Sequence, residues 1–262
     1  MPFATAKDGV RLYYETLGEG EPLLLVRGQA RDHKGWNFIR DDFAATRRVI
    51  VYDHRGTGDS DKPAAPPYTT RGFAEDAIAI LDELGISRAH AYGISMGGRI
   101  GQWLAIDHPD RIGALVLGAT TPGNAHGVRR PAAIDAVLAS GDNEKLLAAL
   151  VSPEWLAANP VYRAIMDDEI RNPIPPYAQK LHYRASEGHD TFDFLPRIIA
   201  PTLVIHGSAD EVNMTANAPL LASRIPGAEL AIIEGGRHGY AEEFRAEASR
   251  VVNDFLDRHP LG

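Results

Sequence analysis

Short apolar runs alternate with helix-length segments along most of this chain. Runs with the length of buried parallel strands lie at residues 23–26, 49–52, 89–92, 114–117, 202–206 and 230–233. Segments long enough for helices lie at residues 70–84, 97–107, 216–225 and 241–259. Residues 10–16 predict an antiparallel edge strand before the series begins. Strands that alternate with helices predict an α/β fold with a mostly parallel, doubly wound sheet.

One long segment, residues 121–196, breaks this alternation. It predicts short helices at residues 132–139, 143–150, 162–170 and 177–186, with prolines between them. Because it leaves the sheet after one strand and returns at the next, we expect it to lie over the carboxyl ends of the strands as a helical lid. The core domain then comprises residues 1–120 and 197–262. The alternative is an ordinary helical subdomain without substrate contacts.

Composition narrows the class of protein. The chain has 262 residues, of which 44% are hydrophobic, enough for one large α/β domain or two small ones. A formal net charge of −8 without a basic block disfavours nucleic acid or an anionic membrane as a partner. No cysteine is present, which excludes disulfides and thiolate chemistry. With no basic and apolar leader and no membrane-length apolar run, we expect a soluble cytoplasmic protein.

The most informative motif is Gly-Ile-Ser-Met-Gly at residues 93–97. It follows a predicted strand and opens a predicted helix, which is the setting of a nucleophile elbow. Such a sharp turn lifts Ser95 above the sheet edge, and side chains at positions 93 and 97 would collide with neighbouring backbone. The motif therefore favours hydrolysis with Ser95 as the nucleophile.

A serine nucleophile needs a base, and the base needs an orienting carboxylate. For an elbow serine the chain order is serine, acid, histidine. Asp210 follows the predicted strand at 202–206, and His238 follows the one at 230–233, so both lie at the sheet edge that Ser95 occupies. Two plainer interpretations stay open: Asp210 could cap the next helix, and His238 could be a solvated loop residue.

The other histidines are assigned no chemistry. We expect His90 and His206 to be structural, and His33, His108 and His259 to lie at helix ends or on the surface. His126, His182 and His189 belong to the lid, where a surface position is favoured over contact with the substrate. His54 belongs to a turn described below. The sequence contains no metal-binding or phosphate-binding motif, so we predict no metal and no cofactor.

Acyl transfer also requires two N–H donors directed at the developing oxyanion. The first candidate is the backbone N–H of Met96, directly after the nucleophile at a helix N-terminus. The second should come from the loop after the strand at 23–26, where we choose Gln29.

Taken together, these residues resemble the α/β-hydrolase family over nearly the whole chain. Residues 53–60, Asp-His-Arg-Gly-Thr-Gly-Asp-Ser, look like the family's Asp-x-Arg-Gly-x-Gly-x-Ser turn, and residues 200–207 look like its acid-bearing strand. The resemblance implies that Asp53 and Arg55 organise the turn. Within the family, residues 93–105 are similar to 3-oxoadipate enol-lactonases, related esterases and cofactor-free haloperoxidases. These relatives imply hydrolysis of a small-molecule ester or lactone through an acyl-enzyme, without a cofactor.

One departure concerns the substrate. Many members have His-Gly where this chain has Arg27-Gly28. Arg27 could bind a substrate carboxylate, but pairing with an acid such as Asp53 or Asp210 is favoured. Trp36 is a further candidate for substrate contact. Two other functions stay open on the same residues: a ligand-binding protein without turnover, and a perhydrolase or lyase that uses the same triad.

Overall fold

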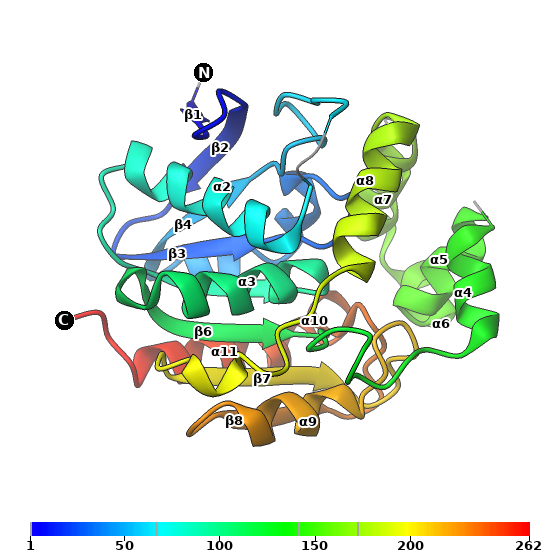
Figure 1. Cartoon of the computed structure of the whole chain (residues 1–262). Helices are drawn as coiled ribbons and strands as arrows, with labels where there is room; N and C mark the ends of the chain where they lie inside the picture. The colour runs from blue at the N-terminus through cyan, green and yellow to red at the C-terminus, as the bar shows by residue number, and fades with distance from the viewer. Residues whose placement is uncertain (1, 66–67, 141, 172) are drawn as a thin grey trace.

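The computed structural model describes residues 2–65, 68–140, 142–171 and 173–262. Its centre is an eight-stranded sheet in the order β1-β2-β4-β3-β5-β6-β7-β8 (Figure 1). The strands are Phe3–Thr5 (β1), Arg11–Leu17 (β2), Glu21–Val26 (β3), Arg47–Tyr52 (β4), Ala89–Ile94 (β5), Ile112–Gly118 (β6), Thr202–Gly207 (β7) and Glu229–Ile233 (β8). Strands β3 to β8 run parallel, which confirms the predicted sheet.

The N-terminal strands correct one expectation. β2 pairs antiparallel with β4, but it is not an edge strand, because β1 pairs with its other side. β1 has three residues, too few for a periodic pattern to be recognised in the sequence. The edge of the sheet therefore lies one strand further out than predicted.

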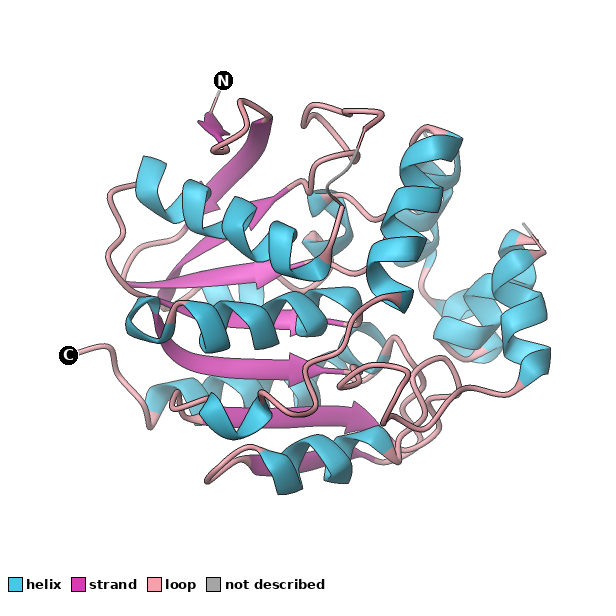
Figure 2. Ribbon diagram, viewed as in Figure 1, coloured by secondary structure: helices cyan, strands magenta, loops and turns pink. Residues whose placement is uncertain are grey.

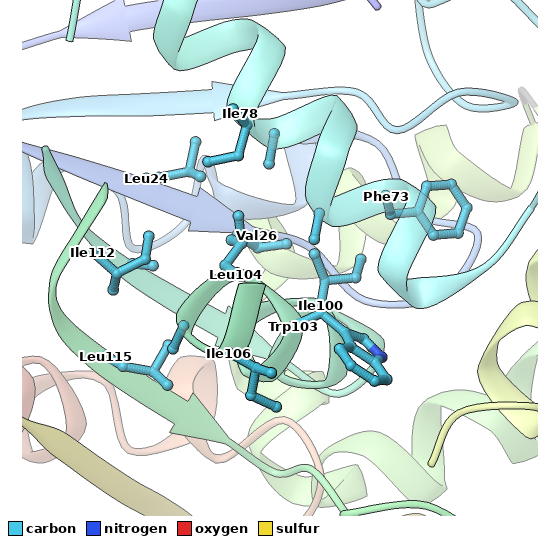
Figure 3. Packing of buried hydrophobic residues seen from close by; sticks show 14 of the residues in the cluster. Leu24, Val26, Phe73, Ile78, Ile100, Trp103, Leu104, Ile106, Ile112 and Leu115 are labelled. Atoms are coloured by element: carbon cyan, nitrogen blue, oxygen red, sulfur yellow. The ribbon is translucent and has the colours of Figure 1, made fainter. Parts of the chain in front are cut away.

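Helices cover both faces of the sheet (Figure 2). One face carries α2 (Thr70–Glu83), α3 (Met96–Asp107) and α9 (Asn217–Arg224), and the other carries α1 (Asp41–Ala44) and α11 (Arg245–Asp257). Figure 3 shows Ile100 and Leu104 of α3 in one buried cluster with Leu24 and Val26 of β3. Each fully buried aliphatic side chain of this size contributes about 1.5–3 kcal/mol, so α3 is held firmly against the sheet.

The C-terminal helix predicted over residues 241–259 is divided in two. α10 (Tyr240–Glu243) ends at Phe244, whose φ of −109° and ψ of 38° are not helical, and α11 begins at the next residue. This break cannot be predicted from the sequence, because residues 240–246 contain neither glycine nor proline.

Residues 121–196 are called the helical segment below. Their described part holds the α-helices α4 (Ala132–Ala139), α5 (Asn143–Leu150), α6 (Pro153–Ala158), α7 (Pro160–Arg171) and α8 (Pro176–Glu187). They lie beyond the carboxyl ends of the central strands (Figure 1). Pro153 is expected from the sequence to separate two helices, but in the structure it is the first residue of α6. The hydroxyl of Ser152 caps this helix and accepts from Trp155 N–H at 3.3 Å. No helix within the described ranges is long and apolar enough to cross a membrane.

Candidate active site

Ser95 occupies a strained turn between β5 and α3. Its φ of 60° and ψ of −120° lie in a region that residues with a side chain rarely adopt. A Cβ atom on Gly93 would overlap the Gly97 carbonyl, and one on Gly97 would lie 2.8 Å from the Arg27 carbonyl oxygen and overlap that of Val26. Glycine is therefore required at both positions, as the elbow motif predicts.

The backbone of Ser95 is fixed by the strand and loop next to it. Its N–H donates to the Gly118 carbonyl at 2.9 Å, and its own carbonyl accepts from the Thr120 hydroxyl at 2.7 Å. The side chain is only partly exposed. The elbow is thus attached to the carboxyl end of β6 as well as to β5.

Asp210 and His238 are in contact. The His238 Nδ1 atom lies 2.9 Å from Asp210 Oδ2, and both residues are buried. The other carboxylate oxygen accepts from the N–H groups of Val212 at 2.8 Å and Asn213 at 3.0 Å. Burial alone would raise the pKa of Asp210, but the charges and side-chain hydrogen bonds of His238 and His206 hold it far below its usual range. The carboxylate is therefore ionised and can accept a hydrogen bond from Nδ1–H of His238, which fixes the orientation of the imidazole.

A second histidine shares this carboxylate. His206, at the end of β7, places Nε2 3.0 Å from Asp210 Oδ2 and 2.6 Å from the Asn213 carbonyl oxygen. Both of these atoms are acceptors, so the proton of a neutral His206 lies on Nε2. His206 is expected from the sequence to be structural only. Its position at a strand end, four residues before Asp210, could have indicated the contact between the two side chains.

The two proposed oxyanion donors come from segments that adjoin Ser95. Met96 begins α3, and Gln29 lies in the loop after β3. A Cβ atom on Gly28 would lie 3.4 Å from Ser95 Cβ and 3.8 Å from its Oγ, so this loop passes directly beside the serine. Among the described residues, neither the Met96 nor the Gln29 N–H has a hydrogen-bond partner. Both groups are therefore available to an anion.

Arg27 has a different partner from the acids named in the sequence analysis. Its guanidinium pairs with Glu242 of α10 at 3.1 Å, and not with Asp53 or Asp210. Both members of the pair are buried: Arg27 is 8% exposed and Glu242 is 4% exposed. The charge of Arg27 is therefore balanced within the protein.

Trp36 lies in the hydrophobic core. Its side chain is fully buried, with its ring 5.5 Å from that of Tyr92 and 5.4 Å from the Arg27 guanidinium carbon. It belongs to the 3₁₀ helix η1 (His33–Trp36), and it packs with the residues that cover the sheet.

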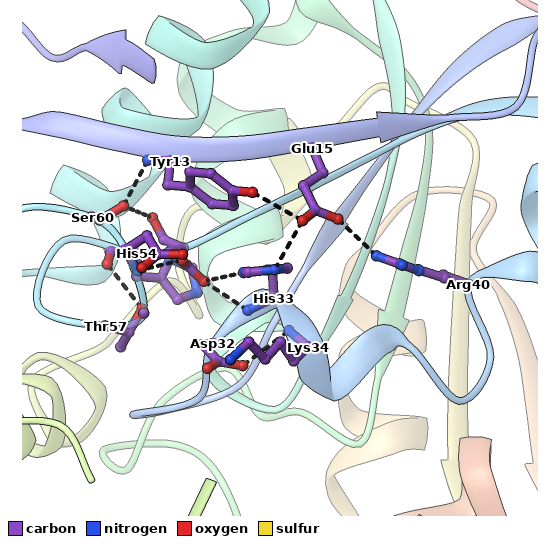
Figure 4. Close-up of polar contacts among 12 residues, drawn as sticks. Tyr13, Glu15, Asp32, His33, Lys34, Arg40, His54, Thr57 and Ser60 are labelled. Atoms are coloured by element: carbon purple, nitrogen blue, oxygen red, sulfur yellow. Dashed lines mark hydrogen bonds and ion pairs between the residues drawn. The ribbon is translucent and has the colours of Figure 1, made fainter. Parts of the chain in front are cut away.

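Asp53 accepts several hydrogen bonds after β4, and Figure 4 shows His33 and Ser60, two residues of the same polar network. One carboxylate oxygen accepts from His33 N–H and contacts His33 Nδ1, both at 2.8 Å, and the other accepts from Asp59 N–H at 2.8 Å. Asp32, His33 and Asp53 place possible metal-ligand atoms within 4.8 Å of one another, a grouping that the sequence motifs do not reveal. The hydrogen bonds between His33 and Asp53 account for this geometry without an ion.

Three histidines expected mainly at helix ends or on the surface are buried. His33, His182 and His189 are 4%, 0% and 2% exposed. Each finds polar partners inside the protein: His33 contacts Asp53, His182 contacts backbone groups, and His189 contacts Thr70. An imidazole whose nitrogen atoms have hydrogen-bond partners can be buried at low cost. The polarity of histidine alone therefore does not predict that these residues are buried.

The comparisons with known proteins extend over most of the chain. The family model described as alpha/beta hydrolase fold matches residues 21–244. An Azorhizobium caulinodans protein named "Putative carbamate hydrolase RutD" is 32% identical, with 98% of this chain and 97% of that protein covered. The enol-lactonase from Burkholderia xenovorans LB400 has a TM-score of 0.84 at 27% identity, covering 98% of this chain and 100% of that one. Est816, described as an N-acyl homoserine lactone degrading enzyme, has a TM-score of 0.83 at 33% identity, covering 97% and 100%.

Proposed function

This chain belongs to the alpha/beta hydrolase fold family, and we propose that it is a serine hydrolase that cleaves a small carboxylic ester or lactone. The observation that carries the proposal is the strained Ser95 at the same sheet edge as the hydrogen-bonded pair of His238 and Asp210. The names of two similar proteins, an enol-lactonase and an N-acyl homoserine lactone degrading enzyme, support a lactone or ester as the substrate class.

In the first half of the reaction, Ser95 Oγ attacks the carbonyl carbon while His238 Nε2 takes the hydroxyl proton. The N–H groups of Met96 and Gln29 donate to the oxyanion of the tetrahedral intermediate. As the intermediate collapses, the bond to the leaving oxygen breaks and His238 returns the proton to it. An ester releases its alcohol at this point, whereas the alcohol of an opened lactone stays attached to the acyl group.

Water completes the cycle. His238 takes a proton from water, the hydroxide attacks the acyl carbon, and the bond to Ser95 Oγ breaks as that oxygen is reprotonated. Asp210 stays ionised throughout and stabilises the imidazolium that forms in each half. The chemistry balances with water as the second substrate and requires no cofactor.

We assign the helical segment the role of a lid over the core formed by residues 1–120 and 197–262. Its α5 helix reaches the loop that carries His238, because the Leu150 carbonyl accepts from Gly239 N–H at 2.7 Å. Since Arg27 is paired with Glu242, we expect a neutral substrate to be hydrolysed as well as one that carries a carboxylate.

A carbamate is the second candidate substrate, because the relative from Azorhizobium caulinodans is named for carbamate hydrolysis. The same three residues could cleave it by the same steps. Its carbonyl is less electrophilic, since nitrogen donates electron density to it, so we expect slower acylation than with an ester of the same size.

The test compares wild type with Ser95→Ala on activated esters, lactones and carbamates. We expect wild type to hydrolyse at least one ester or lactone, and Ser95→Ala to lose about 10⁴-fold or more of that activity. A fluorophosphonate should label wild type on Ser95 and leave the variant unlabelled. Tight ligand binding without turnover or labelling would identify a binding protein instead.

A further inference from the structure

Two buried histidines hold the loop that carries Gln29. This loop, residues 27–30 and called the oxyanion loop below, joins β3 to the residues before η1. His54 Nε2 contacts the Arg27 carbonyl oxygen at 2.9 Å, and the Ala30 N–H donates to His182 Nδ1 at 3.3 Å. The Gln29 N–H therefore lies between two peptide groups that are each bonded to an imidazole.

We propose that His182 of α8 is a positioning residue that directs the Gln29 N–H toward the oxyanion. The inference rests on the proposed function, and it makes the helical segment part of the catalytic apparatus. His182 does not touch the reacting atoms. It acts through the hydrogen bond to Ala30, one peptide group beyond the donor.

The backbone of the oxyanion loop needs such a restraint. Gly28 has no side chain to limit its dihedral angles, so its own backbone restrains the loop little. Ala30 has a φ of 57°, a left-handed conformation that costs about 1–2 kcal/mol for a residue with a Cβ atom. Such a conformation persists only where surrounding contacts impose it, and the bond to His182 is the side-chain contact at this peptide group.

His182 is itself rigidly placed. Because Ala30 N–H is a donor, Nδ1 must be the acceptor, and Nε2 then carries the proton that it donates to the Arg55 carbonyl at 2.8 Å. The ring lies 4.9 Å from that of Phe73 and 5.6 Å from that of Tyr68, and it is fully buried. Burial lowers the pKa of His182 to about 3, so the neutral tautomer required by both bonds persists at any pH where the enzyme would be assayed.

The plainer alternative is that His182 only fixes α8 to the core. A residue with that role would change stability and the yield of folded protein, but not the rate per active site. His189 supplies the matched control, because it is equally buried beyond the end of α8 and bonds Thr70 at 2.9 Å without touching the oxyanion loop.

The experiment uses two substitutions of His182, each of which places a polar group near a different nitrogen of the imidazole. Asparagine at position 182 places an acceptor near the position of Nδ1, whereas glutamine reaches toward that of Nε2 and leaves Ala30 N–H without a partner. We expect His182→Gln to lower kcat for an activated ester about ten- to a hundredfold, with KM changed less than about threefold. His182→Asn should stay within about threefold of wild type, and so should His189→Gln. All rates are expressed per site titrated with the fluorophosphonate.

The inhibition constant of a small trifluoromethyl ketone provides the second readout, because the adduct with Ser95 carries an oxyanion. His182→Gln should weaken this inhibitor by the same factor as kcat. Equal kcat values and inhibitor affinities for His182→Gln and wild type would overturn the positioning role, as would equal losses in the asparagine and glutamine variants. If wild type itself neither hydrolyses the ester nor binds the ketone, the proposed function has failed instead.

Discussion

Ser95 and the oxyanion loop beside it are held by different parts of the molecule. The backbone of Ser95 is fixed from within the sheet and the loop after β6, by Gly118 and Thr120. The oxyanion loop donates a hydrogen bond to His182, and the loop around His238 donates one to the Leu150 carbonyl, both in the helical segment. The proposed nucleophile is therefore placed by the core, whereas the groups that would assist it depend in part on the helical segment.

Two contacts that hold the helical segment against the core differ in burial. His182 of α8 is completely buried, while the contact between the N–H of Ser152, just before α6, and Glu243, at 3.0 Å, is only partly buried. Hydrogen bonds that water can replace contribute less than buried ones, because a buried group left without its partner loses its hydration as well. We therefore expect α8 to stay docked more firmly than α5 and α6.

The largest expected effect comes from breaking the elbow itself. In Gly97→Ala the new Cβ atom would lie 2.8 Å from the Arg27 carbonyl oxygen and overlap that of Val26, so α3 and β3 must separate. We expect kcat/KM for an activated ester to fall about 10³-fold, since both the serine and the oxyanion loop are displaced.

Gly101→Ala, in the same helix, is the control for this variant. Its Cβ atom would lie 3.1 Å from Cδ1 of Leu115, a side chain that can move, so activity should change little. Circular dichroism would verify that both variants are folded. Near-normal activity in Gly97→Ala would mean that the core does not fix the nucleophile in this way.

A smaller effect is expected beyond the oxyanion loop, where a titratable pair joins His33 to Asp53. Burial lowers the pKa of His33, but the contacts with Asp53 and Glu15 raise it by more, so that it lies above its usual value. A raised pKa in the folded state means that the stabilisation is fully present below the unfolded pKa, about 6.5, and is lost as the pH rises through the folded value.

His33→Gln tests this link. We expect it to lower the free energy of unfolding by about 2 kcal/mol at pH 6, as for other hydrogen bonds to charged groups, and by less at pH 9. Urea unfolding at both pH values measures the difference, and effects of other groups cancel in the comparison with wild type. A difference that stays constant with pH would show that the charge of His33 does not contribute.

Much of the fold can be predicted from the sequence because the dominant signal is local. The parallel strands are short apolar runs, and glycines at positions 93 and 97 reveal the elbow since that turn excludes a Cβ atom. The contact between Asp210 and His238 follows from parallel topology, which brings the ends of neighbouring strands together.

Contacts between distant residues are harder to predict. Arg27 pairs with Glu242 of α10, which lies 215 residues away in the sequence. The burial of His182 depends on which face of α8 packs on the core. The buried positions Ala178, His182 and Ala185 have helical spacing, but they are small or polar, so the pattern carries little hydrophobic signal.

The smallest expected effect concerns the loop of His238. Gly239 has a φ of −90°, so alanine is allowed by the backbone, but its Cβ atom would lie 2.8 Å from Cγ1 of Val151 and 3.0 Å from the Leu150 carbonyl oxygen. We expect Gly239→Ala to lower kcat about tenfold, because a shift of a few tenths of an ångström at His238 misaligns the proton transfer.

Removing the opposing atom should reverse this loss. Val151→Ala alone should cost about 2 kcal/mol of stability, since Val151 is fully buried, and leave kcat nearly unchanged. In the double variant Gly239→Ala/Val151→Ala, Cγ1 is gone and kcat should return to within about threefold of wild type. Failure to recover would mean that the contact with Val151 is not the cause, and would leave the remaining contact with the Leu150 carbonyl oxygen or a change within the His238 loop as the cause. Recovery would mean that the end of α5 affects kcat by packing against this loop. The proposed effect of α8 on the oxyanion loop would be its counterpart, exerted through the hydrogen bond to His182.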